Sequence, residues 1–415
     1  MIWKGYVKMN EIVTERSELF EPNVYITVCV EIAGKVCPHK LSDAVKRAFE
    51  ANESTMSKIV LEQGTAYYEK MSASNCKIKI KNENRNWVEL VTRTEKIPFA
   101  IDDGELVKVF IIPSADKTRL VVMAHHLAGD GKSIIYFVKD IMNSLAGIPL
   151  AYKPLTLFGR DLPKKGLSVI AKLYASYCNH KWDNRFFTWR DYYDIHNKYW
   201  ETVSSDIKYK TLSVEETQKI IENAKQIGCS VNSYVVTLFL QKYPNLRNVG
   251  IPVSVRQDKN EAMSNLVSAV YFNYKYDEEK TFAQNAMRVH KKITGKLKRH
   301  RFFVLQFLSR MPLTLLDAVL FNTYGYCDDR LAKKTAKIMG YFGKYKKDLG
   351  ITNLTVLDIP TSYGDYQIEN IIFVPPSISY SNNIFGVSTV NGRITVSYHN
   401  IKNSGMDALL SNKNI

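Results

Sequence analysis

The chain has 415 residues, of which 45% are hydrophobic and 24% charged, and a formal net charge of +16. This composition is typical of a folded globular protein, and the length suits two lobes better than a single core. No apolar run approaches the roughly 20 residues of a membrane-spanning helix. The first residues have no apolar signal core, and the six cysteines form no CxxC pair. These features exclude a disulfide-stapled or membrane-spanning protein and predict a cytoplasmic one with reduced thiols.

Predicted strands and helices alternate along the chain. In residues 1–150 we expect helices near 40–52 and 132–146, and strands near 23–33, 65–71, 76–81, 106–113 and 119–125. Residues 151–206 form a connecting region rich in aromatic residues. Residues 207–415 begin with a helix over 212–227, which Ser213 and Glu216 start as a capping box. A helix near 231–243 follows, and strands are expected near 249–255, 267–275, 352–357, 370–374, 384–390 and 393–399.

The most informative motif is His125-His126-x3-Asp130-Gly131, at the end of a predicted strand. Because side chains alternate along a strand, the two histidines are expected to face opposite sides. Asp130 then occupies the N-cap position of the helix that follows the turn. A histidine at a strand end can serve as a general base.

Three other roles for this motif are a metal site, a phosphate-binding loop and a purely structural one. A metal site is disfavoured because adjacent strand histidines diverge and no Cys or Glu lies nearby at ligand spacing. A phosphate-binding loop is disfavoured although Gly131-Lys132-Ser133 copies its end, because His126 stands where that motif requires glycine. A structural role remains open, in which the two histidines pack and the aspartate only caps a helix.

The motif resembles the HHxxxDG signature of the condensation-domain and chloramphenicol-acetyltransferase-like superfamily of acyltransferases. This superfamily includes alcohol acetyltransferases and polyketide-associated acyltransferases. Further stretches resemble the family in order along most of the chain: 41–52, 98–109, 228–233, 251–256, 265–267, 351–354 and 391–398. The resemblance implies a two-lobed α/β pseudo-dimer, with a mixed sheet covered by helices in each lobe. Lobes are expected at 1–150 and 207–415, joined by the connecting region 151–206.

The position of the motif in the first third of the chain resembles condensation-type members, in which one chain supplies both lobes. The Asp-Phe-Gly-Trp-Gly motif of plant BAHD acyltransferases is missing, and the nearest stretch, 382–386, has no tryptophan. The chain also shows no adenylation motif and no phosphopantetheine-serine motif. Any activated donor must therefore be a separate molecule.

The resemblance implies a role for each motif residue. His126 is the general base, with His125 on the other face. Asp130 pairs with an arginine, for which Arg256 is the matching residue, and holds the motif loop. Gly131 leaves room for the backbone to approach the thioester. Two residues are candidate oxyanion donors, with ordinary strand-end hydrogen bonding as the alternative: Thr352 and Asn353.

The implied activity is transfer of an acyl group from a thioester to an alcohol or amine. The donor, acyl-CoA or a phosphopantetheine-linked acyl group, is a substrate, and no bound cofactor or metal is expected. Amide condensation on carrier-protein-bound substrates is the alternative reaction. A non-catalytic relative that binds carrier proteins or acyl chains is the alternative function.

The positive charge is concentrated in one part of the sequence. Residues 288–347 contain 15 Lys or Arg and 3 Asp, which gives +12 of the net +16. Within it, a basic cluster is a candidate donor-binding site: Lys291, Lys292, Lys298 and Arg299. Coenzyme A phosphates, an acidic acyl carrier protein or an anionic membrane surface would fit this charge. Nucleic acid is not expected because no recognition motif accompanies the charge, and a solvated helix face is the alternative. The apolar stretch that follows, to Leu320, is either core or the wall of an acyl tunnel.

Overall fold

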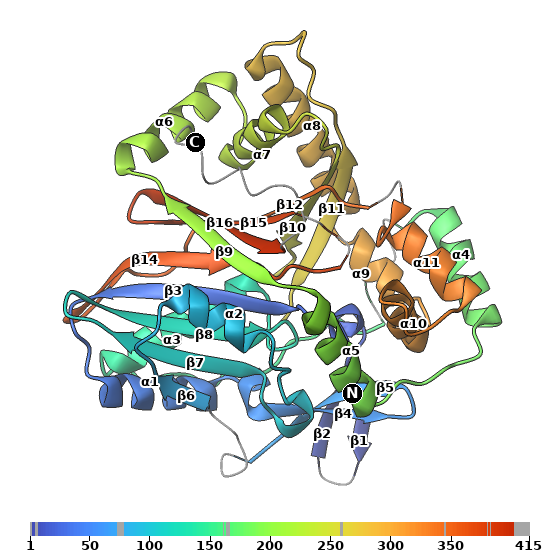
Figure 1. Cartoon of the computed structure of the whole chain (residues 1–415), viewed down its shortest axis with the longest axis horizontal. Helices are drawn as coiled ribbons and strands as arrows, with labels where there is room; N and C mark the ends of the chain where they lie inside the picture. Colours follow the sequence, from blue (N-terminus) through green and yellow to red (C-terminus); the bar gives the residue numbers. More distant parts are fainter. Residues whose placement is uncertain are drawn as a thin grey trace.

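The computed structural model describes residues 2–4, 7–72, 79–160, 162, 167–257, 260–343, 346–379, 381 and 383–401. Two six-stranded mixed sheets, each associated with helices, form two lobes (Figure 1). The predicted two-lobed α/β architecture is therefore confirmed. A smaller four-stranded sheet lies beside the N-terminal lobe and contains β1 (Ile2–Lys4), β2 (Val7–Glu11), β5 (Thr65–Lys70) and β4 (Ser57–Glu62).

The N-terminal sheet carries the histidine motif. Its strands, in spatial order, are β13 (Ser362–Tyr363), β14 (Tyr366–Val374), β3 (Tyr25–Ala33), β8 (Lys117–His125), β7 (Val107–Pro113) and β6 (Lys79–Asn82). Only β6 and β7 run parallel; the other neighbours are antiparallel. Helices α1 (Pro38–Ala51) and α3 (Gly131–Leu145) pack against each other on one face of this sheet (Figure 1). The central strand β8 is apolar because both faces are covered.

The C-terminal sheet has a parallel centre flanked by antiparallel strands. Its order is β11 (Val267–Asn273), β10 (Asn248–Ser254), β12 (Leu349–Val356), β15 (Ile384–Val390), β16 (Arg393–Ile401) and β9 (Ser205–Thr211). Three helices cover it: α6 (Val214–Ile227), α7 (Val231–Lys242) and α8 (Phe282–His300). The predicted capping box of Ser213 and Glu216 starts α6.

Strand β14 joins the two lobes. It comes from the segment assigned by sequence to the C-terminal lobe, yet it pairs with β3 in the N-terminal sheet. It also contacts the C-terminal sheet, where the Ser388 hydroxyl donates to the Ile371 carbonyl at 2.7 Å. The chain therefore crosses between lobes near its end, which holds the two sheets together.

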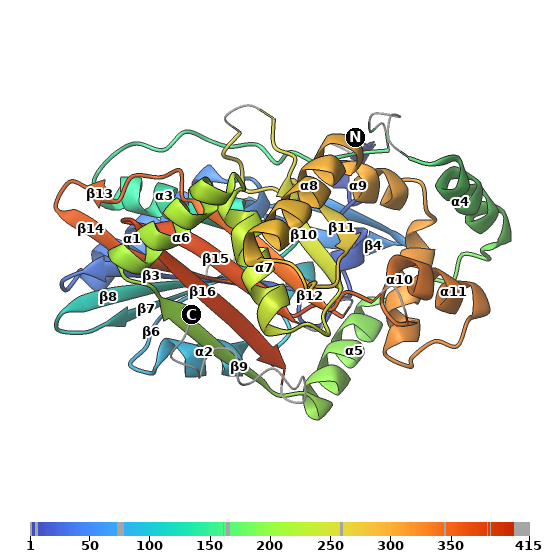
Figure 2. The ribbon, with the colours of Figure 1, turned by 90° about the horizontal axis from the view of Figure 1, so that it is seen from above.

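The remaining helices lie around the junction of the lobes: α2 (Trp87–Thr94), α4 (Val169–Lys181), α5 (Trp189–Thr202), α9 (Phe303–Leu308), α10 (Leu313–Thr323) and α11 (Arg330–Met339). Figure 2 shows α4, α10 and α11 together at one end of the molecule. Among the described residues, no helix combines the length and apolar character needed to cross a bilayer. The described cysteines, 29, 37, 178, 229 and 327, are free, and Cys76 lies outside the described residues, as do 76–78 of the strand expected at 76–81.

Candidate active site

The two histidines of the motif have different surroundings. His125, the last residue of β8, is fully buried, and its Nδ1 accepts a hydrogen bond from the Leu127 amide at 3.2 Å. Burial, together with the smaller effects of nearby His126 and His196, lowers the pKa of His125 to about 3. This imidazole is therefore neutral at cellular pH and packs as part of the core.

His126 lies in the turn after the strand, where it is half-buried and lines a cavity between the lobes. Its Nδ1 is buried and makes no hydrogen bond to any described residue. Of the two histidines, only His126 can meet a substrate in this cavity.

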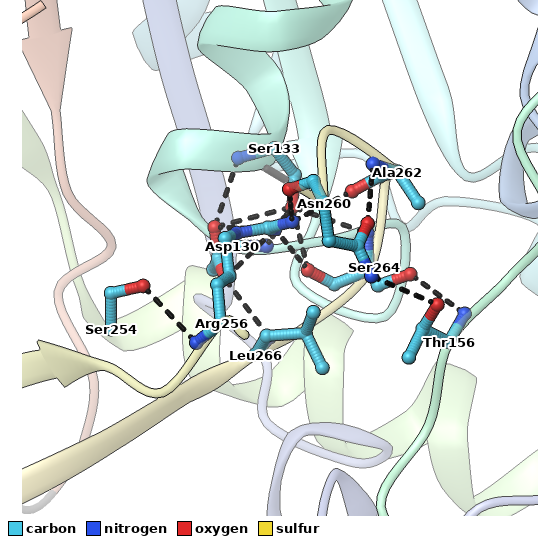
Figure 3. A network of polar contacts seen from close by, with 9 residues as sticks. All are labelled: Asp130, Ser133, Thr156, Ser254, Arg256, Asn260, Ala262, Ser264 and Leu266. Carbon is cyan, nitrogen blue, oxygen red and sulfur yellow. Dashed lines mark hydrogen bonds and ion pairs between the residues drawn. The ribbon is translucent and has the colours of Figure 1, made fainter. Parts of the chain in front are cut away.

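Asp130 connects the motif loop to the C-terminal lobe (Figure 3). It is the N-cap of α3, and its carboxylate accepts a hydrogen bond from the Ser133 amide at 2.9 Å. The same carboxylate accepts from the Leu266 amide at 2.9 Å and from Arg256 Nη2, which lies 3.2 Å from each oxygen. The Asp130 and Arg256 side chains are both 6% exposed, so water does not screen their ion pair.

The two terminal nitrogens of Arg256 also bind the segment between β10 and β11. Its guanidinium donates to three backbone carbonyls at 2.8–3.1 Å, those of Asn260, Ala262 and Ser264. Asp130 follows β8 in one lobe and Arg256 follows β10 in the other. Their network therefore fixes the loop that carries His126, and the Asp130 carboxylate is fully engaged in that contact.

Gly131 lines the cavity, and close packing around it also explains why this position is a glycine. A Cβ atom here would lie 2.9 Å from the Phe373 ring and 3.1 Å from a Leu354 methyl group. The space beside Gly131 is thus taken by side chains of β14 and β12. Close packing therefore also favours glycine here, and the expected approach of a thioester to this backbone stays a prediction.

The cavity next to His126 has a volume of about 590 Å³ and a mostly apolar wall. This size is within the range of roughly 300–1,000 Å³ for small-molecule sites. Residues of both lobes line it, and α4, α9 and α11 complete it. No group of three or more His, Cys, Asp or Glu side chains in the described part of the chain is arranged to hold a metal ion.

The two candidate oxyanion donors occupy different positions on β12. Thr352 lines the cavity together with His126. The Asn353 amide instead accepts from the Thr355 backbone at 2.7 Å and donates to Asn232 at 3.4 Å. Successive side chains of a strand point to opposite faces, so only Thr352 is placed to meet a group bound beside His126.

The basic cluster lies on α8, where all four side chains are exposed. None of them is among the residues that line the cavity. Figure 2 shows α8 running towards α9, which does contribute to the cavity wall. The cluster is therefore outside the site and could meet only a part of a donor that projects from it.

Glu15 is a site residue that the sequence analysis missed. It lines the cavity, is 1% exposed, and its carboxyl oxygens have no described hydrogen-bond partner beyond residues 14–15. Burial raises the pKa of Glu15 to about 7. The adjacent Arg16 forms a buried ion pair with Asp317 of α10, Nε to Oδ1 at 2.7 Å, which fixes this segment.

Glu15 also lies close to the motif loop. The Tyr68 hydroxyl donates to the carbonyl of Leu127, the residue after His126, at 2.8 Å. The pKa of Tyr68 is raised mainly by burial and further by the nearby Glu15 charge. No local pattern in the sequence marks Glu15 as a site residue, because Thr14-Glu15-Arg16 is an ordinary polar stretch.

No protein-family model and no curated protein sequence matches the chain, but solved structures match over nearly its whole length. Polyketide synthase associated protein 5 from Mycobacterium tuberculosis is 14% identical with a TM-score of 0.60, covering 96% of this chain and 94% of that one. The condensation domain of the monacolin K polyketide synthase MokA is 11% identical with a TM-score of 0.63, covering 96% and 93%. TRI3 trichothecene 15-O-acetyltransferase from Fusarium sporotrichioides is 12% identical with a TM-score of 0.60, covering 94% and 90%. The chain therefore has the fold that these condensation-domain and acetyltransferase structures share, in agreement with the fold that the motif resemblance implied.

Proposed function

We propose that the protein is an acyltransferase that moves an acyl group from a thioester to an alcohol or amine, with His126 as the general base. The observation that carries the proposal is the position of His126 on the wall of a mostly apolar cavity. The loop that carries this histidine is held by the buried pair of Asp130 and Arg256. An acyl chain suits such a wall, and an imidazole beside it suits proton abstraction.

In the proposed reaction, His126 takes the proton of the acceptor as its oxygen or nitrogen attacks the thioester carbonyl carbon. The C–S bond of the resulting tetrahedral intermediate breaks, and the thiol leaves with the proton returned by His126. Thr352 is the proposed hydrogen-bond donor to the oxyanion. A positioned base of this kind contributes about 10²–10⁴ in rate.

The donor proposed is acyl-CoA or an acyl group on a carrier-protein phosphopantetheine, both found in the cytoplasm. The basic cluster would attract the phosphates of either donor. On the acceptor side, the buried carboxyl of Glu15 would accept a hydrogen bond from a hydroxyl or amine. The names of the similar structures include both condensation domains and an acetyltransferase, which leaves both amide and ester products within the proposal.

The test is thiol release from a panel of acyl-CoAs of increasing chain length, offered with mixed alcohols and amines. We expect release that depends on an acceptor and falls at least a hundredfold in His126→Ala. The same assay with acyl-loaded carrier protein follows if no CoA thioester reacts. Binding of both donors without thiol release would contradict the proposal and indicate a non-catalytic binding protein.

A further inference from the structure

Helix α4 presents an exposed row of large apolar side chains, which we call the α4 patch: Val169, Ile170, Leu173 and Tyr177. Their exposed fractions are 69%, 80%, 66% and 46%. The spacing of these residues places them on one side of the helix. Each such side chain left in water costs free energy, so a row of four on one helix needs an explanation.

The opposite side of α4 holds the helix on the protein. Ala175 and Cys178 are buried, and the Tyr174 hydroxyl lies 2.8 Å from the Thr335 hydroxyl of α11. The Ser168 side chain caps the helix by accepting from the Ala171 amide at 3.2 Å. The α4 patch is therefore the outward face of a docked helix, and its exposure does not result from a frayed end.

Positive charge surrounds the α4 patch. Helices α4, α9 and α11 contain six Lys or Arg and no Asp or Glu: Lys172, Lys181, Arg330, Lys333, Lys334 and Lys337. Lys334 lies over the ring of Tyr177 at 5.4 Å. The acidic residues next to these helices are Asp183, just after α4, and Asp328 with the N-cap Asp329, just before α11.

The cavity of the candidate active site reaches the surface at this helix. Ile170 lines the cavity and is also 80% exposed, and Ile338 of α11 lines it while 44% exposed. Phe303 and Phe307 of α9 form another part of the same apolar wall. A continuous apolar path thus joins the exposed row of α4 to the cavity that contains His126.

We propose that the α4 patch is a docking surface for an anionic lipid membrane, and that the cavity receives a long-chain acyl or lipid substrate directly from it. Aliphatic side chains that protrude from a helix between lysines match an interfacial helix, whose apolar face enters the bilayer while lysines meet lipid phosphates. The apolar wall would spare an acyl chain from crossing water. Membrane docking stands independently of the reaction, whereas substrate delivery rests on the proposed acyl transfer.

The test is co-sedimentation of the purified full chain with vesicles of neutral phosphatidylcholine and with vesicles that also contain phosphatidylglycerol. We expect binding to the anionic vesicles that weakens at high salt. Val169→Asp/Leu173→Asp, which changes two residues of the α4 patch that do not line the cavity, should reduce this binding roughly tenfold or more, because two inserted side chains are lost. Val214→Asp/Ile221→Asp, which changes two exposed apolar residues of α6 far from α4, is the matched control and should bind as wild type (Figure 2).

The outcomes separate the docking surface from the reaction. Turnover of a water-soluble short-chain thioester should be unchanged in Val169→Asp/Leu173→Asp, since neither side chain lines the cavity, and the melting temperature of this variant should equal that of wild type. Equal vesicle binding by the α4 and α6 variants would overturn the proposal, as would no binding of wild type to anionic vesicles. Loss of acyl carrier protein binding in the α4 variant, without any vesicle binding by wild type, would assign the surface to a carrier protein instead.

Discussion

Replacement of Glu15 by glutamine tests the buried carboxyl of the cavity. In the folded protein the pKa of Glu15 is raised by burial from 4.5 to about 7. The folded state therefore favours the protonated form, and its stability falls as the pH rises from the unfolded pKa through the folded one. Glutamine has nearly the same shape and does not ionise, so Glu15→Gln should be free of this loss.

The size of the effect follows from the two pKa values. Each unit of difference corresponds to about 1.4 kcal/mol, so wild type should lose about 2.5 kcal/mol relative to Glu15→Gln between pH 5 and pH 8. For a chain of this length unfolding cooperatively, that change amounts to about 3 °C in melting temperature. The gain from the substitution should therefore be small at pH 5 and largest at pH 8.

The assay is a set of thermal melts of both proteins at pH 5, 6, 7 and 8. Glu18→Gln is the control, because Glu18 also lines the cavity but is partly exposed. Melting temperatures of wild type and Glu15→Gln that differ by a constant amount at every pH would refute the reasoning. An equal pH-dependent gain in Glu18→Gln would show that general charge on this segment, rather than burial of Glu15, causes the effect.

If Glu15 also contacts the acceptor, Glu15→Gln should raise KM for the acceptor more than it lowers kcat.

Three other predictions address the proposed site. Asp130→Asn should lower the free energy of unfolding by about 3 kcal/mol, because it leaves buried Arg256 without its counter-ion; an unchanged urea midpoint would exclude a structural role for the pair. His126→Ala should abolish most turnover with little change in melting temperature, whereas His125→Ala should mainly lower the melting temperature because it empties a buried position; turnover losses of equal size with equal stability would mean that the base is wrongly assigned. Neutralising the basic cluster to glutamine should weaken acyl-CoA binding in low salt and have less effect in high salt, and calorimetry showing equal affinity at both salt concentrations would leave the cluster as solvated surface.

Local features were predictable because they depend on residues only a few positions apart. The apolar run before His125 specified a strand, and the turn with Asp130 specified a helix N-terminus; the structure has β8 ending at His125 and α3 capped by Asp130. The capping box at Ser213 was predicted for the same reason. Strand alternation indicated that only one histidine would face a pocket but could not decide which one.

Contacts between distant segments needed either the family resemblance or the tertiary structure. The resemblance matched Arg256 to Asp130 across 126 positions, and no spacing rule in the sequence connects the two. Strand β14 was expected near its observed place, yet its pairing with β3 in the other lobe was not, because a strand pattern states which residues alternate and leaves the partner unspecified. Helices of the connecting region and of residues 282–339 were not predicted individually.

The sequence by itself determined the strand–turn–helix that carries His126, the two-lobed α/β class and the excess of positive charge. Only the tertiary structure decided that His125 is core, that Thr352 faces the cavity while Asn353 does not, and that Glu15 is buried there. It also placed the apolar face of α4 at the opening of that cavity. The physical reason is that backbone geometry follows from short-range sterics and hydrogen bonds, whereas burial and pKa depend on side chains brought together from remote parts of the chain.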